Sequence, residues 1–301
     1  MTIIEKIKKL KDEKNAIILA HNYQLPEVQD IADITGDSLG LSIEASRTSA
    51  DIIVFCGVYF MAETAKILSP FKTILIPDKN SGCPMADMIT PEQLRDMKKK
   101  HPGAKTLCYV NTSAEVKAES DVCCTSSNAM LVAQKAFNPT DEIIFAPDKN
   151  LAQYIASQTN RAFILWPGYC RTHERILPEY VHQAREKHPD SEVIVHPECN
   201  PLVTELADRV LSTGEMKKHV SETNQKSFII GTETGMLYRL KQDNPGKDFY
   251  PVSEIAVCPN MKRNTLHKIL RSLENMTDEI VLSEEIIKKA GKSIQQMIKY
   301  V

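Results

Sequence analysis

The sequence predicts an α/β fold of three similar three-layer αβα units, each with a small parallel sheet, arranged with pseudo-threefold symmetry around a central site. Three cysteines of similar setting lead to this prediction. Cys83, Cys170 and Cys258 each follow a strand-like run, and they stand 87 and 88 residues apart. The segments before them alternate helical and strand patterns. A fixed period of this kind indicates a repeated structural unit, and the alternation indicates parallel sheets with helices on both faces.

Each unit is expected to open with a polar helix and to continue into a β-branched strand. The helices are predicted at 3–14, 91–100 and 178–187, and the strands at 17–20, 106–110 and 192–195. A polar loop follows each strand, and His21, Asn111 and His196 are taken as equivalent positions there. A second strand is predicted at 52–55, 143–146 and 228–231, and a third strand leads to the cysteine. The predicted units span 1–84, 85–172 and 173–261, with helices in 262–301 packing back on the first.

Composition limits the classes of function. The chain has 301 residues, 42% of them hydrophobic, and a formal net charge of −2 without a basic face. These values indicate a globular protein with small-molecule ligands and argue against nucleic-acid binding. No window approaches the ~18 apolar residues of a membrane span, and the polar first helix is unlike a signal peptide. We therefore expect a cytoplasmic protein whose eight cysteines are reduced thiols.

Three hydroxyl residues recur at one position of the repeat. Ser38, Ser126 and Thr213 lie 88 and 87 residues apart, and each is expected to open a helix. The free N–H groups and the dipole of a helix start favour anions, so three convergent helix starts would bind carboxylates or a phosphate. The alternative for any single hydroxyl is ordinary helix capping.

Acid and base side chains follow the first strands. In parallel α/β sheets, ligands bind beyond the carboxyl ends of the strands, so these side chains are expected in one cleft. They are His21, Tyr23, Tyr109, Asn111, His196 and Glu198, with His173 three residues after Cys170.

The three repeated cysteines are candidate metal ligands. Three thiolates can bind zinc or three irons of a cubane cluster, and the cluster leaves a fourth iron open as a Lewis acid. Zinc stays possible, because the sequence gives ligand types and not the metal. The other five cysteines lack the repeat position and are interpreted as small buried hydrophobic residues; they are Cys56, Cys108, Cys123, Cys124 and Cys199.

Six motifs carry a resemblance to a known family. They read AHNYQ at 20–24, GDSLG at 36–40, CGVYFMAETAKIL at 56–68, PGYCRTH at 167–173, HPEC at 196–199 and CPNM at 258–261. With them, the chain resembles the quinolinate synthase family over essentially its whole length. The segment CPNMKRN lacks the second cysteine of a CxxC pair found in some members, which puts a regulatory disulfide there in doubt.

The resemblance implies a 4Fe-4S cluster held by Cys83, Cys170 and Cys258, whose open iron acts as a Lewis acid. It also implies condensation of iminoaspartate with dihydroxyacetone phosphate to quinolinate, with loss of phosphate and two waters, in de novo NAD biosynthesis. An L-aspartate oxidase or dehydrogenase would supply the iminoaspartate. The protein itself would be a monomer or a homodimer.

The resemblance further assigns roles to residues of this chain. The implied catalytic residues are Tyr23, Tyr109, His196 and Glu198. The implied substrate-binding residues are His21, Ser38, Met61, Asn111, Ser126, His173, His196 and Thr213. Glu198 is expected to be the base of the ketose-aldose step, with a pKa raised by desolvation.

Two rival interpretations remain at this point. One is another three-cysteine iron-sulfur enzyme of the same architecture, such as the hydroxymethylbutenyl diphosphate reductase or the diphthamide-synthesis enzyme, which would use the cluster for electron transfer or radical chemistry. The other is a non-catalytic iron-sulfur sensor, which would not need Tyr23, Tyr109 and Glu198 in the cavity.

Overall fold

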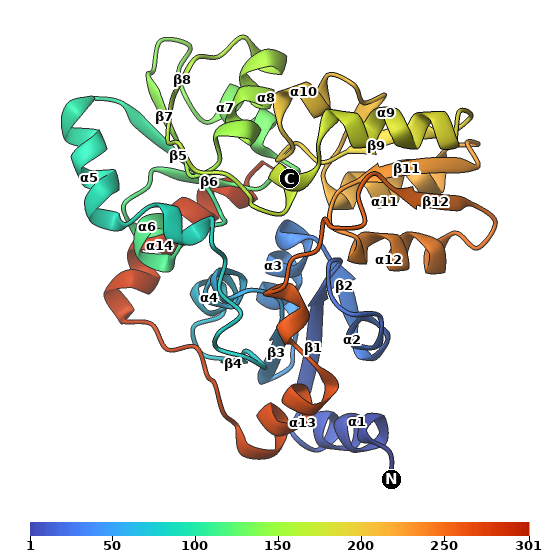
Figure 1. Ribbon diagram of the computed structural model, residues 1–301. Coiled ribbons are helices and arrows are strands. Elements are labelled where there is room, and N and C mark those ends of the chain that lie inside the picture. The colour runs from blue at the N-terminus through green and yellow to red at the C-terminus, as the bar shows by residue number, and fades with distance from the viewer. Residues whose placement is uncertain (301) are drawn as a thin grey trace.

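The computed structural model describes residues 1–300 and confirms the α/β fold. It contains three sheets of four parallel strands, one in each third of the chain, which form the three lobes seen in Figure 1. The strand orders are β2-β1-β3-β4, β6-β5-β7-β8 and β10-β9-β11-β12. The three sheets therefore share one topology, in which the first strand of each unit lies inside the sheet.

The elements of the three units correspond one to one. The first unit has α1 (Ile3–Glu13), β1 (Ala16–His21), α2 (Pro26–Ile31), β2 (Ile34–Gly36), α3 (Ser38–Arg47), β3 (Ile52–Cys56), α4 (Tyr59–Leu68) and β4 (Thr73–Leu75). The second has α5 (Pro91–Lys100), β5 (Lys105–Tyr109), α6 (Ala114–Ala118), β6 (Val122–Cys124), α7 (Ala129–Lys135), β7 (Ile143–Ala146), α8 (Lys149–Thr159) and β8 (Phe163–Leu165). The third has α9 (Pro178–Lys187), β9 (Glu192–Val195), α10 (Pro201–Thr204), β10 (Arg209–Val210), α11 (Thr213–Glu222), β11 (Ser227–Gly231), α12 (Gly235–Asp243) and β12 (Asp248–Pro251).

The sequence pattern missed one strand in each sheet. β2, β6 and β10 are two or three residues long, and each pairs in parallel with the first strand of its unit. Such short edge strands carry no periodicity of their own, so only pairing identifies them. The unit is therefore α-β-α-β-α-β-α-β, with four strands rather than three.

A recurring carboxylate aligns the three units. Asp33, Asp121 and Asp208 each accept a hydrogen bond from a backbone N–H fifteen residues earlier, on the first strand, at 2.7–2.8 Å. Counting from this contact makes Tyr109 the counterpart of His21 and His196. Asn111, predicted as that counterpart, is instead equivalent to Tyr23 and Glu198. The expected equivalence was wrong because the polar letters of the loop were aligned instead of the strand ends.

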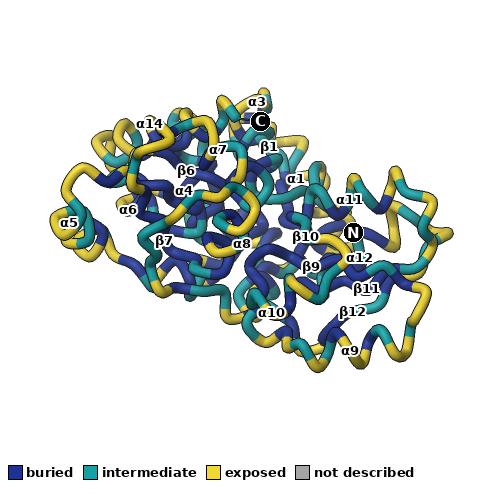
Figure 2. The backbone as a smooth tube through the Cα atoms, turned by 90° about the horizontal axis from the view of Figure 1, so that it is seen from above, coloured by how far each residue is buried: buried dark blue, intermediate teal, exposed yellow. Residues whose placement is uncertain are grey.

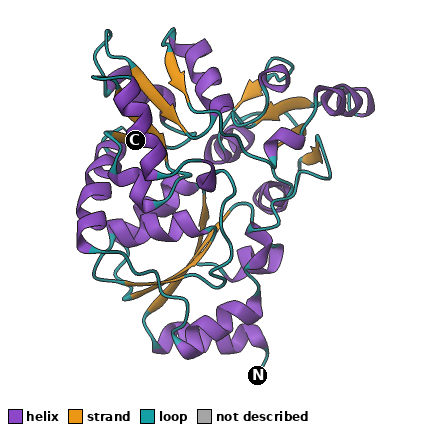
Figure 3. Cartoon of the chain, turned by 60° about the vertical axis from the view of Figure 1, so that its left-hand side comes forward, coloured by secondary structure: helices purple, strands orange, loops and turns teal. Residues whose placement is uncertain are grey.

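Apolar strands sandwiched by helices form the core. Figure 2 shows buried backbone in the interior, where the two inner strands of each sheet lie, and Figure 3 shows helices on both sides of the sheets. In the first sheet, Ile18, Leu19 and Ala20 are all fully buried. Strands of a parallel sheet covered on both faces are expected to be apolar throughout. Both faces being covered, the polar groups of each unit collect at its strand ends.

The last two helices pack on different units. α13 (Leu266–Asn275) lies against α1, whereas α14 (Glu284–Ile298) lies against α6, β6 and α4 (Figure 1). Ser293 of α14 donates to the backbone oxygen of Lys117 at 2.8 Å. The tail therefore contacts the first two units, and the unit boundaries at 84, 172 and 261 stay a proposal. No helix within residues 1–300 has the length and apolar character needed to cross a membrane.

Replacing Asp121 by alanine should destabilise the protein by roughly 1–2 kcal/mol, because the N–H of Thr106 loses its acceptor at the start of β5. Urea denaturation followed by circular dichroism measures the change. Asp96→Ala removes a carboxylate that pairs only with exposed Lys99, and it should leave the curve within about 0.5 kcal/mol. Equal effects of the two substitutions would contradict the aligning role.

Candidate active site

One cavity lies where the strand ends of the three units meet, and it encloses about 680 Å³ up to its open mouth. It contains every residue that the sequence analysis singled out for the site. They are His21, Tyr23, Ser38, Met61, Cys83, Tyr109, Asn111, Ser126, Cys170, His173, His196, Glu198, Thr213 and Cys258. Groups up to 237 positions apart in the chain thus face a common space.

Two of the three hydroxyls begin helices. Ser38 is the first residue of α3 and Thr213 the first residue of α11, whose N-cap Ser212 forms the expected capping box with Glu215. Ser126 differs, because α7 begins three residues later, at Ala129, after a turn. The anion-binding potential of helix starts therefore applies to the first and third units, while the second offers only a hydroxyl.

The three cysteines occupy equivalent turns. A 3₁₀ turn begins three residues after each of them, at Ala86–Met88, His173–Arg175 and Met261–Arg263. In each turn, the backbone N–H of the residue three positions on points at the cysteine sulfur and favours its thiolate. Three like donors, each with the same local support and all on one cavity, fit the needs of a metal cluster.

The electrostatics of these thiols are dominated by burial. Burial raises the pKa of Cys83 to about 12 and raises the pKa of Cys170 and Cys258 as well, while the turn N–H groups oppose the shift. A sulfur with a raised pKa binds a proton unless a cation takes its place. The remaining five cysteines are 0–1% exposed and occupy the core as expected.

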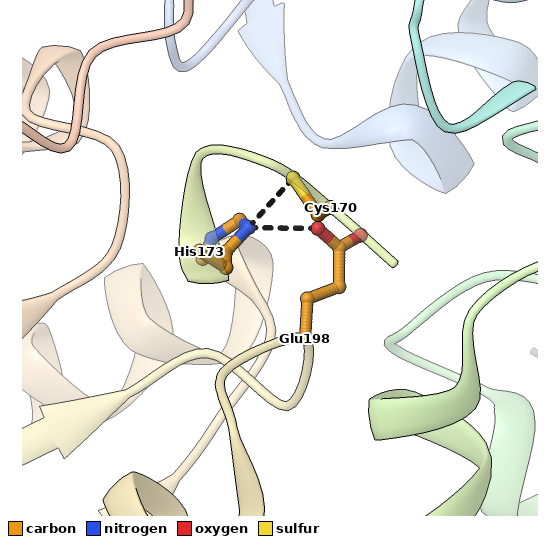
Figure 4. A group of neighbouring side chains, drawn as sticks. All are labelled: Cys170, His173 and Glu198. Atoms are coloured by element: carbon orange, nitrogen blue, oxygen red, sulfur yellow. Dashed lines mark hydrogen bonds and ion pairs between the residues drawn. The ribbon is translucent and has the colours of Figure 1, made fainter. Parts of the chain in front are cut away.

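A second donor set overlaps the first. Cys170, His173 and Glu198 offer ligand atoms within 4.8 Å of one another, which a single metal ion could also use (Figure 4). In this arrangement Nδ1 of His173 lies 2.8 Å from Oε2 of Glu198 and 3.2 Å from Sγ of Cys170. Glu198 accepts a hydrogen bond from the Nδ1–H of His173, so two of these three ligand atoms already pair with each other. The repeated cysteine turns are therefore the better candidate.

Glu198 lies among hydrogen-bond donors. Burial alone would raise the pKa of its carboxyl group, but the charge and hydrogen bond of His173, with a further bond from the Tyr109 hydroxyl at 2.5 Å, lower that pKa below its usual range. The expectation of a raised pKa was wrong, because the sequence placed Glu198 beside apolar groups and the fold places it beside His173. Glu198 is thus a carboxylate at neutral pH.

A chain of hydrogen bonds continues on the other side of His173. Its Nε2 lies 2.8 Å from the hydroxyl of Thr232, which lies 2.6 Å from the hydroxyl of Tyr23. Burial, reinforced by the charge of Glu198, raises the pKa of Tyr23 and Tyr109, so both phenols are protonated. The chain therefore joins the two tyrosines through a carboxylate, an imidazole and a hydroxyl.

His21 and His196 are a matched pair of neutral donors. Burial lowers the pKa of His21 to about 4 and that of His196 to about 3. Each Nδ1 accepts the backbone N–H two residues on, from Tyr23 and Glu198, at 3.2 and 3.3 Å. With Nδ1 an acceptor, the proton of each neutral ring is on Nε2. Both rings thus offer an N–H donor for an anionic ligand.

Among the residues missed in the sequence, Glu233 and Asp37 line the cavity, and Thr232 is bonded to Tyr23 and His173 in its wall. Thr232 and Glu233 directly follow β11, and Asp37 accepts a hydrogen bond from the hydroxyl of Ser127 in the neighbouring unit at 2.7 Å. A signal was present for the first two, since polar residues at the end of a parallel strand are expected to face the site. Apart from His173, the acid and base residues expected in the site all follow the first strand of a unit, whereas Thr232 and Glu233 follow the third, β11.

Fold and site together define the class: a threefold α/β protein with one cavity between its sheets that is lined by thiols and by acid and base side chains.

The model of the family described as "Quinolinate synthetase A protein" matches residues 5–299. Curated quinolinate synthases are similar over nearly their full length. That of Dehalococcoides mccartyi (strain CBDB1) is 52% identical over 299 residues, covering 99% of this chain and 98% of that protein. That of Geobacter sp. (strain M21) is 53% identical over 297 residues, covering 99% and 97%. The chain therefore belongs to the quinolinate synthetase A family, a family of enzymes.

Acid should destabilise the fold through His21. Its pKa is about 4 when folded and about 6.5 when unfolded, so between these values the unfolded chain binds a proton that the folded chain does not. The contribution of His21 to the free energy of unfolding is therefore fully present above pH 6.5. It falls by about 1.4 kcal/mol per pH unit as the pH drops toward 4. In His21→Asn the decline should be shallower by that amount, measured by urea denaturation at pH 7, 6 and 5.

His182→Asn is the matched control, since this histidine is exposed on α9. It should leave the pH slope unchanged. An unaltered slope in His21→Asn would show that the buried imidazole does not set the acid sensitivity.

Proposed function

We propose that this protein makes quinolinate for NAD biosynthesis by condensing iminoaspartate with dihydroxyacetone phosphate. One phosphate and two waters leave, and these products balance the atoms of the two substrates. An L-aspartate oxidase or dehydrogenase would supply the iminoaspartate. The proposal is supported by membership of the quinolinate synthetase A family and, above all, by three equivalent cysteine turns that face neutral donors and a proton chain in one cavity.

Cys83, Cys170 and Cys258 would hold a 4Fe-4S cluster. When bound, such a cluster supplies an iron without a protein ligand, which can act as a Lewis acid for a departing hydroxyl. Their common turn geometry and the pairing of His173 Nδ1 with Glu198 favour this set over a single ion at Cys170, His173 and Glu198. The other residues of the cavity then have to bind two anionic substrates and move protons.

Anion binding would fall to the strand and helix ends. The Nε2–H groups of His21 and His196 and the helix starts at Ser38 and Thr213 offer donors to carboxylates and phosphate. Asn111 adds a side-chain oxygen that is buried without a hydrogen-bond partner, so its amide is available to a substrate. Both histidines are neutral at neutral pH, so this binding depends on hydrogen bonds rather than on imidazolium charge. Ser126 and Met61 would form the remaining walls.

Protons would be transferred along the series of hydrogen bonds that connects Tyr109 to Tyr23. Glu198 is ionised and can accept a proton during the ketose-aldose step, with Tyr109 bound to one oxygen and His173 to the other. A low carboxylate pKa makes it a weaker base than the sequence suggested. A positioned general base contributes typically about 10²–10⁴-fold, and a pKa far below the working pH places Glu198 toward the lower end of that range. Tyr23 lies at the other end of this hydrogen-bond series, and it can donate a proton during dehydration.

Glu198→Gln should slow quinolinate formation by at least ~100-fold, because the amide cannot accept the proton. Quinolinate is measured by liquid chromatography and mass spectrometry, using anaerobically reconstituted protein with iron and sulfide contents equal to the parent. Glu179→Gln, an exposed change on α9, is the matched control and should retain the parent rate. Parent-like turnover in a cluster-loaded Glu198→Gln protein would exclude the proposed base.

Cys170→Ala tests the cluster itself. It should reduce bound iron and abolish quinolinate formation, because one of three ligands is lost. Phosphate release should match quinolinate one to one in the parent protein. A parent protein that reconstitutes fully yet forms no quinolinate would favour the rival functions in electron transfer, radical chemistry or sensing.

A further inference from the structure

Glu233 is a buried carboxylate beside one of the cysteines. It is 0% exposed, follows β11 and lines the cavity. Its Oε1 accepts the backbone N–H of Cys258 at 3.0 Å, and its Oε2 accepts the N–H of Gly235 at 2.8 Å. A carboxylate with two backbone donors is fixed in position, and here it fixes the peptide unit of a cluster ligand.

Lys262 completes this arrangement from the far side of the cysteine turn. Its ammonium group lies 2.9 Å from Oε1 and 3.1 Å from Oε2 of Glu233, and it also donates to the backbone oxygen of Tyr23. One ion pair thus joins the turn that carries Cys258, in the third unit, to the loop that carries Tyr23, in the first.

The backbone around this pair leaves no spare room. A Cβ at Gly235 would lie 2.6 Å from Nζ of Lys262, 2.8 Å from Oε2 of Glu233 and 2.9 Å from the carbonyl carbon of Tyr23. Gln29 makes a second tie across the same boundary, since its amide donates to the backbone oxygens of Asn22, Gln24 and Gly235. The contact between the two loops is therefore specific and close.

The other units lack this device. The positions equivalent to Glu233, two residues past the third strand of each unit (β3, β7 or β11), hold Val58 and Asp148. Asp148 accepts the N–H of Asn150 at 2.8 Å, as Glu233 does with Gly235. Within residues 1–300, however, no hydrogen bond joins Asp148 to a cysteine. The asymmetry singles out Cys258 among the three turns.

We infer that Glu233 and Lys262 are positioning residues that hold Cys258 for cluster ligation, couple its turn to Tyr23 and set the local charge beside the cluster. The inference rests on the proposed function, because it needs a cluster at Cys258. The pair is neutral as a unit, so removing either partner leaves a net charge next to the iron-sulfur site. An ion pair remote from the cluster would weaken folding in both single variants without moving the cluster's potential in opposite directions.

The test is the reduction potential of the reconstituted cluster, followed by electron paramagnetic resonance in an anaerobic redox titration. Glu233→Gln leaves the lysine charge and should shift the potential upward, because a nearby positive charge favours the reduced cluster. Lys262→Met leaves the carboxylate and should shift it downward. The double variant, which removes both charges, should return close to the parent. Shifts of the same sign, or none, would overturn the inference.

Ligand positioning has its own readout. Iron loss to an excess of chelator should be several-fold faster in Glu233→Gln than in the parent, since the Cys258 turn loses its acceptor. Glu192→Gln is the matched control: it makes the same charge change in the third unit, on a residue that pairs with Arg209 and His219 away from the cavity. It should leave both potential and iron loss unchanged. Equal iron loss in Glu233→Gln and the parent would remove the positioning role.

The outcomes separate the two proposals. A parent protein that takes up no iron and sulfide would contradict the proposed function itself. If the parent protein binds a cluster but Glu233→Gln changes neither its reduction potential nor its rate of iron loss, only this inference is contradicted. Lys262→Met leaves a buried carboxylate without its cation and is expected to destabilise the fold strongly. If this variant does not fold, the potentials of Glu233→Gln and of the double variant are sufficient to test the inference.

Discussion

The direction of the strands is the constraint on which the site depends. All four strands of every sheet are parallel, so each unit delivers its polar strand ends to one edge, and the three edges meet at a single cavity. Helices cover both faces of the sheets and keep the strands apolar. Chemistry can therefore gather only in the short loops between strand and helix. The repeat places three thiols on this cavity, because a cysteine at one position of the unit occurs in all three units.

Symmetry in the backbone is combined with asymmetry in the side chains. The three cysteine turns are alike, yet the positions five residues after the aligning backbone N–H hold a tyrosine, an amide and a carboxylate, namely Tyr23, Asn111 and Glu198. One cavity thus presents a donor, an amide and an acceptor at geometrically related places. His173 connects the acceptor Glu198 to the donor Tyr23, since its Nδ1 contacts Glu198 and its Nε2 contacts Thr232, which is bonded to Tyr23. A threefold scaffold can in this way present different chemical groups to different parts of one cavity.

Sequence patterns predicted the fold and the members of the cavity because both follow from local periodicity and repeat position. They failed where the answer depends on contacts across units. The pKa of Glu198 was misjudged because His173 is 25 residues away in the chain and reaches it only through the fold. Glu233 carried no repeat signal, since its counterparts are Val58 and Asp148. The strand β2 was missed because three residues show no period, and only its pairing with β1 defines it.

The position of α14 bears on the order in which the chain can fold during synthesis. Residues 284–298 cover α6 and β6, more than 150 positions upstream, where Ser293 lies 3.3 Å from the sulfur of Cys123 and bonds to Lys117. A ribosome synthesises a chain from its N-terminus, so the face of the second unit that α14 covers stays open to solvent until residues 284–298 have emerged. Completion of the second unit, which supplies Tyr109 and Cys170 to the cavity, is thereby tied to a helix that is synthesised well after the unit itself.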